Sequence, residues 1–261
     1  MMQRFMGGLC LLVSLFLLSG CGPRPPAPAE LRVAVAANFV PTLKQLSEAY
    51  NRAHLEEPIH LQTMVGSTGL LYAQIEVGAP FDLFFAADVE RPARLAEQKK
   101  TLGPAQVYAL GRLALWAPVA NFKAPEKRLL EGEFERVAMA NPAVAPYGAA
   151  AESVLRRLGL WGSIQPQLIR GENVSQAYQY LASHRAELGF VALSQVRQTN
   201  LEMQAESLWI VPDNMHQPLQ QAAVVIAGEK QALAEAFLQF CQGKQGREII
   251  EAAGYDLPEQ F

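Results

Sequence analysis

Four small uncharged residues, Gly66-Ser67-Thr68-Gly69, stand where a run with strand-like alternation ends and a run with helical spacing begins. Hydroxyls and flexible backbone at such a junction suit four kinds of chemistry. Ser67 could cap the helix, attack a substrate as a nucleophile, belong to a nucleotide-phosphate loop, or bind a small anion. The neighbouring residue types and the rest of the chain must decide among these roles.

Patterns typical of catalysis or of a metal centre are missing around this junction. Gly66 precedes Ser67 directly, so the Gly-x-Ser-x-Gly elbow of a hydrolase nucleophile is not formed. No lysine follows, whereas a Walker phosphate loop requires Gly-Lys-Ser/Thr. The histidines lack the spacing of metal ligands: His54, His60, His184 and His216. The sequence therefore predicts no catalytic residue, no metal-ion site and no enzyme activity.

Junctions of the same kind, with small or polar residues at a predicted helix start, recur along the chain. A helix start exposes free backbone N–H groups and the positive end of the helix dipole, so it can hold an anion. Each junction alone can equally be an ordinary N-cap, and spacing does not reveal whether they meet in one cleft. They are Ala37-Asn38-Phe39, Gly66–Gly69, Pro146-Tyr147-Gly148 and Gly171-Glu172-Asn173-Val174.

Strands alternate with helices in two series of similar size, over residues 31–98 and 137–193. Strands separated by helices favour a parallel sheet between helical layers. We therefore expect an α/β protein with two units. Long strands near 112–118 and 222–227 could connect the units twice.

Four stretches of the chain together resemble the periplasmic molybdate-binding protein of ABC importers. They read VAVAANF, GSTGLLYAQIEVGAPFDLFFAAD, NPAVAPYGAAAESVLRRLG and LGFVALSQ, and the similarity extends from about Leu31 to the C-terminus. The resemblance implies a two-lobed type II periplasmic binding protein, with a mixed sheet flanked by helices in each lobe and the ligand cleft between the lobes. We accordingly expect residues 31–112 and 226–261 in lobe 1 and residues 113–225 in lobe 2.

Matched position by position, the resemblance places the oxyanion ligands at Asn38, Ser67, Tyr147 and Val174, with the backbone N–H as the donor at Tyr147 and Val174. It implies molybdate or tungstate as the ligand, molybdenum only in that bound form, and no cofactor. It also implies a monomer that delivers the anion to an ABC permease in the inner membrane. None of the four residues is charged, which suits a fully deprotonated dianion that accepts hydrogen bonds at every oxygen.

The sequence departs from the family at two of the relevant positions. Ala192 stands where many members have a tyrosine whose hydroxyl completes the site, and Asn38 stands where serine is common. The longer Asn38 carboxamide could supply the missing donor, or it could only cap the following helix. Sulfate or another tetrahedral oxyanion stays open as the ligand. So does an envelope lipoprotein that uses the same fold as an enzyme or sensory domain.

The N-terminal region is expected to be processed rather than folded. Residues 1–20 combine Arg4 with a short apolar run, which is typical of a secretory signal. Leu18-Ser19-Gly20-Cys21 resembles a bacterial lipobox and predicts that Cys21 is acylated and becomes the mature N-terminus, with a plain signal peptide as the alternative. The proline-rich residues 21–30 predict an extended tether. We therefore expect a lipid-anchored protein in the periplasm or on the exterior face of the cell envelope.

The net charge and the cysteine content bear on two further questions, nucleic-acid binding and disulfide formation. The formal net charge of −3 lacks the basic excess of a nucleic-acid binder, so no nucleic-acid partner is expected. Cys10 lies in the predicted signal and Cys21 is predicted to carry lipid, which leaves Cys241 without a disulfide partner. Cys241 stands in an apolar helical run and is predicted to be buried.

Overall fold

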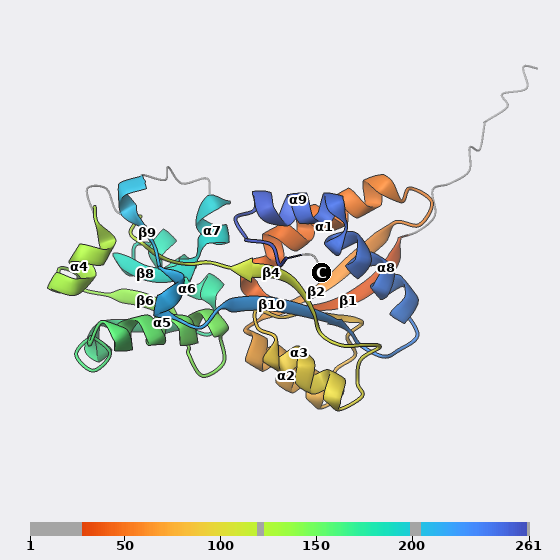
Figure 1. Cartoon of the computed structure of the whole chain (residues 1–261), viewed down its shortest axis with the longest axis horizontal. Helices are drawn as coiled ribbons and strands as arrows, with labels where there is room; N and C mark the ends of the chain where they lie inside the picture. Colours follow the sequence, from red (N-terminus) through yellow and green to blue (C-terminus); the bar gives the residue numbers. More distant parts are fainter. Residues whose placement is uncertain (1–27, 119–122, 199–204, 260–261) are drawn as a thin grey trace, which may run out of the picture.

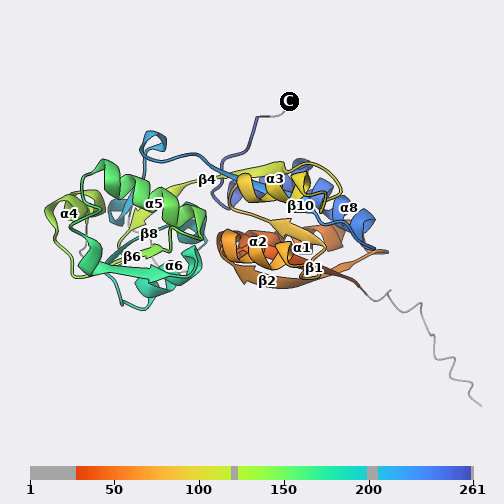
Figure 2. The same ribbon diagram turned by 90° about the horizontal axis from the view of Figure 1, so that it is seen from below.

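The structure, a computed structural model, describes residues 28–118, 123–198 and 205–259. Two five-stranded sheets, each covered by helices, form two lobes that lie side by side (Figures 1 and 2). The predicted α/β class with two units is confirmed. The predicted signal peptide (1–20) and the predicted acylation site, Cys21, lie outside the described residues. None of the helices in the described ranges is long and apolar enough to cross a membrane.

The first sheet has the strand order β2-β1-β3-β10-β4. β1 runs parallel to β2 and β3, whereas β10 runs antiparallel to β3 and β4. Because helices cover both faces, the central strands are apolar on both sides rather than alternating with polar residues. The strands are β1 Ala29–Ala36, β2 Ile59–Gly66, β3 Leu83–Phe85, β4 Gln106–Gly111 and β10 Leu219–Val225.

The second sheet has the strand order β7-β6-β8-β5-β9. β6 runs parallel to β7 and β8, whereas β5 runs antiparallel to β8 and β9. Both sheets are therefore mixed, as the family resemblance implied, rather than purely parallel. The strands are β5 Leu113–Trp116, β6 Val137–Ala140, β7 Leu168–Gly171, β8 Leu188–Ala192 and β9 Leu208–Ile210.

Alternate residues of β1 face two different helical layers of the first lobe. Leu31 and Val33 pack in one apolar cluster with α1, α8 and α9, whereas Ala34 packs in another with α2 and α3. Cys241 of α8 is fully buried in the first of these clusters, as predicted. The helices are α1 Val40–Ala53, α2 Thr68–Glu76, α3 Glu90–Glu97, α8 Gln231–Gln242 and α9 Lys244–Ala252.

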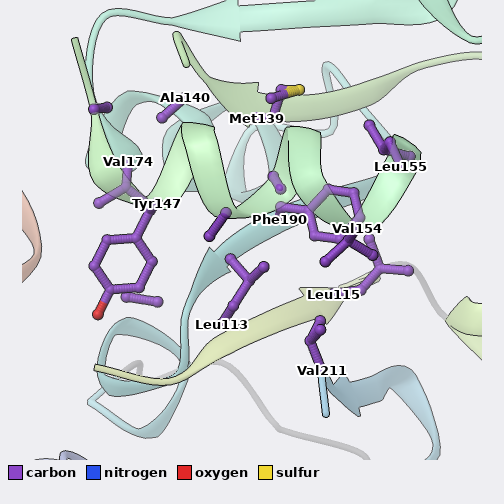
Figure 3. Packing of buried hydrophobic residues seen from close by; sticks show 14 of the residues in the cluster. Leu113, Leu115, Met139, Ala140, Tyr147, Val154, Leu155, Val174, Phe190 and Val211 are labelled. Carbon is purple, nitrogen blue, oxygen red and sulfur yellow. The ribbon is translucent and has the colours of Figure 1, made fainter. Parts of the chain in front are cut away.

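In the second lobe, α5 covers one face of the sheet, where Val154 lies against Leu115 and Phe190 (Figure 3). The other face packs against α6, and Leu181 of that helix is fully buried. Two further helices, α4 and α7, also pack against strands of this sheet. The helices are α4 Pro125–Glu131, α5 Pro146–Arg157, α6 Val174–Ala182 and α7 Leu193–Arg197.

The chain crosses between the sheets at Arg112, which separates β4 from β5, and again between β9 and β10. Two expected boundaries are wrong. β10 pairs with β3 and β4, so residues 219–225 belong to the first lobe, although that lobe was expected to resume only at residue 226. The tether was expected to reach residue 30, but Ala29 and Glu30 already pair with β2. In both cases long-range strand pairing, which local composition does not encode, moves the boundary.

Candidate functional site

The four predicted junctions meet at one cavity between the two lobes. The cavity measures about 10 Å³, roughly the space that one water molecule needs, so as it stands it excludes a ligand as large as a sugar or an amino acid. Asn38, Ser67, Tyr147 and Val174 all line it. The other lining residues are also uncharged: Ala36, Ala37, Gly66, Thr68, Ala87, Ala145, Pro146 and Asn173.

Three helices of eight residues or more begin at this cavity. α2 starts after the end of β2, and α5 and α6 start at Pro146 and Val174. The first N–H groups of a helix have no partner within it, and its dipole is positive at this end. A short 3-10 helix, η1 (Ala37–Phe39), brings the end of β1 to the same place. The cavity therefore collects hydrogen-bond donors and positive partial charge from both lobes without any formal charge.

Ser67 occupies the N-cap position of α2, but its hydroxyl forms no capping hydrogen bond. The side chain is buried, and Oγ has no hydrogen-bond partner. Of the roles that the sequence left open for Ser67, the helix cap is therefore not formed. A buried hydroxyl without a partner costs about 1–3 kcal/mol of desolvation. Such an atom at a cavity is a candidate ligand donor.

Asn38 is buried, and both N–H groups of its carboxamide are already used. Nδ2 donates to Gln221 Oε1 at 2.9 Å and to the Tyr255 hydroxyl at 3.1 Å. The hypothesis that this side chain reaches across the cleft in place of the family tyrosine is therefore wrong. Ala192 is buried at the end of β8 and does not belong to the cavity lining. If Asn38 donates to a ligand, the donor must be its backbone N–H, because both carboxamide N–H groups are used.

Tyr147 and Val174 stand in the first turns of α5 and α6, where backbone N–H groups have no partner within the helix. Tyr147 is the second residue of α5, after Pro146, and its hydroxyl accepts a hydrogen bond from Gln221 Nε2 at 3.0 Å. Val174 is the first residue of α6, and the preceding Asn173 caps the helix by accepting from the Gln176 N–H at 3.0 Å. The cap satisfies the third N–H of α6, so the N–H of Val174 has no partner within the helix or from the cap.

A second cavity of about 300 Å³ shares Ala87, Ala145 and Pro146 with the first and is lined by the acidic residues Asp88 and Glu90. Asp88 in this cavity is paired with Arg91, so its charge is neutralised locally. A further cavity of about 680 Å³ lies at the opposite end of α2 and is lined by carboxylates as well as cations. Neither combines several helix starts with an uncharged lining. Among the described residues no three His, Cys, Asp or Glu side chains are grouped to hold a metal ion.

Sequence patterns gave no signal for Gln221 and Tyr255, which lie behind the site. Gln221 is fully buried on β10, and Tyr255 follows α9 near the C-terminus. The Tyr255 hydroxyl donates to the backbone oxygen of Asn38 at 2.9 Å. Both residues lie more than 180 positions from Asn38, so only the folded chain brings them together.

Direct contacts between the lobes flank the cavity. Gly69 N–H of α2 donates to the Val144 carbonyl of the second lobe at 2.9 Å. On the α6 side, the Ser175 hydroxyl donates to the Ala37 carbonyl at 3.0 Å. A Cβ at Gly69 would lie 3.0 Å from Val144 O and 3.1 Å from Val144 Cα, which is too close for an ordinary contact. Glycine at this position therefore permits the observed closeness of the lobes.

We expect Gly69→Ala to weaken ligand binding roughly fivefold, about 1 kcal/mol, because the methyl group forces the lobes apart by a few tenths of an ångström. The stability of the ligand-free protein should change little, because the higher helix propensity of alanine offsets the weakened hydrogen bond from Gly69 to Val144. Calorimetric titration and thermal unfolding measure the two effects. Gly103→Ala is the matched control, because a Cβ there meets nothing within 4 Å. Equal affinities of the Gly69 variant and the wild type would contradict this role.

Burial raises the pKa of three tyrosines around the site, Tyr108, Tyr147 and Tyr255, the last to about 12. Their phenols stay neutral below pH 10, so they contribute no pH dependence to binding at neutral pH. In the unfolded chain they ionise near pH 10, and stability should fall as the pH rises from there towards 12. The slope is about 1.4 kcal/mol per pH unit for each phenol.

Urea unfolding between pH 8 and 11.5 tests this alkaline loss. Tyr255→Phe should reduce the slope, because one phenol no longer titrates. A slope equal to that of the wild type would rule out Tyr255 as a source of the effect.

Comparison with known families gives one clear match over most of the chain. The family described as bacterial extracellular solute-binding protein matches residues 31–256. The matched range contains both lobes and all four junctions at the cavity.

Curated relatives and a solved structure agree with this match. The molybdate-binding protein ModA of Azotobacter vinelandii is 38% identical over 232 residues, covering 88% of this chain and 90% of the relative. The protein of the same name from Rhodobacter capsulatus is 37% identical over 234 residues, with the same shares covered. The solved Azotobacter vinelandii periplasmic molybdate-binding protein superposes with a TM-score of 0.81 at 36% identity, covering 88% of this chain and all of that chain.

Proposed function

We propose a function on one premise: the chain belongs to the bacterial extracellular solute-binding protein family. The protein binds molybdate, or the similar tungstate, in the cavity between its lobes and delivers it to an ABC permease. The observation that carries the proposal is a small cavity lined by hydrogen-bond donors from both lobes, without a carboxylate, and with the unpartnered Ser67 hydroxyl in its lining.

The donor-only lining suits the chemistry of molybdate. Near neutral pH molybdate is a tetrahedral dianion without a proton, so each of its oxygens accepts hydrogen bonds. The donors proposed are the Ser67 hydroxyl and the backbone N–H groups of Asn38, Tyr147 and Val174. Each hydrogen bond to a charged group contributes about 1.5–3 kcal/mol, and closure and immobilisation of the ligand offset part of the sum. Binding at micromolar dissociation constants or below follows, about −8 kcal/mol or better.

A protonated oxyanion fits this site less well. Monohydrogen phosphate needs an acceptor for its remaining proton, and no carboxylate lines the cavity. Sulfate has no proton and is the competing ligand, differing from molybdate in size rather than in hydrogen-bonding capacity.

Isothermal calorimetry of the purified protein against molybdate, tungstate, sulfate and phosphate tests the assignment. We expect molybdate and tungstate to bind at least tenfold more tightly than sulfate, about 1.4 kcal/mol, and phosphate to bind least. If sulfate binds more tightly than molybdate, the protein is still an oxyanion receptor, but its ligand is sulfate and not molybdate. No binding of any of the four would refute the receptor itself.

The same proposal covers the protein's setting in the cell. It acts as a monomer in the periplasm or at the exterior face of the envelope, and its mechanism is capture, closure of the lobes and docking on the permease. No step of that mechanism breaks or forms a covalent bond, so the protein is not an enzyme.

We predict that Cys21 is the mature N-terminus and carries lipid. The motif Leu18-Ser19-Gly20-Cys21 motivates this prediction. Bilayer anchoring through a single acyl chain is marginal, so stable attachment requires more than one chain. Intact-mass spectrometry of protein extracted from membranes should show a chain that starts at Cys21 and carries acyl groups. A free N-terminus at another residue would contradict the prediction, and Cys21→Ser should release the protein from the membrane fraction.

A further inference from the structure

A buried polar network lies directly behind the cavity, with Gln221 at its centre. Gln221 is fully buried on β10, the strand by which the chain returns from the second lobe to the first. Its carbonyl oxygen accepts from Asn38 Nδ2 at 2.9 Å and from the Tyr108 hydroxyl at 3.1 Å. Its Nε2 donates to the Tyr147 hydroxyl at 3.0 Å.

The two ends of this carboxamide contact different lobes. Asn38 and Tyr108 belong to the first lobe, whereas Tyr147 is the second residue of α5 in the second lobe. A carboxamide carries an acceptor and a donor on one planar group, so it can join an N–H donor on one side to a hydroxyl acceptor on the other. An apolar side chain of the same length can do neither.

Close packing at the crossing point supports a specific link rather than a chance contact. Gly111, the last residue of β4, pairs with Leu219 of β10. A Cβ at Gly111 would lie 2.3 Å from the Tyr147 hydroxyl and 2.6 Å from Gln221 Nε2. The absence of a side chain at Gly111 therefore makes the space in which Gln221 meets Tyr147.

We propose that Gln221 is a positioning residue for the anion site. Through its hydrogen bond to the Tyr147 hydroxyl, it fixes the position of the α5 N-terminus relative to Asn38 when the two lobes are in contact. Gln221 does not line the cavity, so it acts through the two residues that do. This inference rests on the proposed function, because it assigns Gln221 to the closed, ligand-binding arrangement of that site.

Two substitutions each remove the hydrogen bond between Gln221 and Tyr147, one by changing the donor and one by changing the acceptor. Gln221→Met keeps the length of the side chain and removes both hydrogen-bonding groups. Tyr147→Phe removes only the hydroxyl and keeps the aromatic ring and the backbone N–H proposed to contact the anion. We expect each to weaken molybdate binding roughly tenfold. The double variant should bind no more weakly than Gln221→Met, within about twofold, because the Tyr147 hydroxyl has already lost its Gln221 partner in that variant.

Tyr108→Phe is the matched control. It removes a hydrogen bond to the same Gln221 oxygen, but this bond joins two strands of the first lobe and does not reach the second. We expect it to lower the melting temperature of the ligand-free protein while leaving molybdate affinity within about twofold of the wild type. A purely structural role for Gln221 would instead give the three single variants the same pattern: lower melting temperature and unchanged affinity.

Calorimetry with molybdate and thermal unfolding without ligand, on the wild type and the four variants, decide the matter. Wild-type affinity retained in Gln221→Met and Tyr147→Phe would overturn the inference and leave the proposed function intact. Strictly additive losses in the double variant would also overturn it. If Gln221→Met does not fold, the comparison of Tyr147→Phe with Tyr108→Phe still decides. A wild type that binds no molybdate would refute the proposed function, and this inference with it.

Discussion

Ser67→Ala is expected to weaken molybdate binding by roughly tenfold to more than a hundredfold, because one hydrogen bond to a charged ligand contributes about 1.5–3 kcal/mol. The same change should leave the ligand-free protein equally stable or slightly more stable. The Ser67 hydroxyl is buried without a partner and forms no capping bond, so its removal relieves a desolvation cost and breaks nothing. Calorimetric titration and thermal unfolding of the two proteins measure both effects.

The opposite pattern is expected at the neighbouring hydroxyl. Thr68 Oγ1 accepts from the Ala87 N–H at 2.9 Å, so Thr68→Val leaves a buried donor without a partner. It should lower stability by about 1–3 kcal/mol and reduce affinity less than Ser67→Ala does. If Ser67→Ala instead lowers stability by about 0.5–2 kcal/mol with unchanged affinity, the side chain is an N-cap and not a ligand.

Val174→Pro is expected to have a comparable effect on binding through the backbone. Proline at the first position of a helix is well tolerated, because the N–H that it lacks has no partner within the helix. Asn173 has φ −146° and ψ 174°, an extended conformation compatible with a following proline. The substitution therefore deletes one proposed anion donor with little change to α6. We expect molybdate binding to weaken at least tenfold, about 1.4 kcal/mol, measured by calorimetry.

Val174→Ala separates the donor from the side chain. Alanine keeps the N–H and shortens a side chain that packs in the second-lobe core. Stability should fall by about 0.8 kcal/mol for each buried methyl group removed, with a much smaller change in affinity than in the proline variant. Equal losses of affinity in the two variants would assign the effect to packing and not to the N–H.

Much of the molecule could be predicted from local sequence. The alternation of strands and helices over residues 31–98 and 137–193 reflects patterns of a few neighbouring residues, and both series form as expected. Burial of Cys241 followed from the apolar run around it. The uncharged junction at Gly66–Gly69 argued against a catalytic or nucleotide-binding role, because those chemistries need residue types that are not there.

The four residues that were expected to bind the anion line one cavity, but the side-chain contacts of Ser67 and Asn38 were not predicted. The family resemblance placed Asn38, Ser67, Tyr147 and Val174 in one cleft, and all four line one cavity. Whether Ser67 caps its helix depends on a side-chain rotation, and whether the Asn38 amide is free depends on Gln221 and Tyr255. These are properties of contacts and not of residue types.

By itself, the sequence determined the elements, their order and the lack of charge where the helices begin. Only the tertiary structure decided that β10 joins the first sheet, that three helix starts and η1 converge on a cavity, and that Gln221 links Asn38 to Tyr147. The physical reason is the separation along the sequence of the residues that interact. Helix and strand patterns arise from side chains a few positions apart, whereas strand pairing and buried hydrogen bonds join residues up to 217 positions apart, whose proximity depends on the packing of the whole chain.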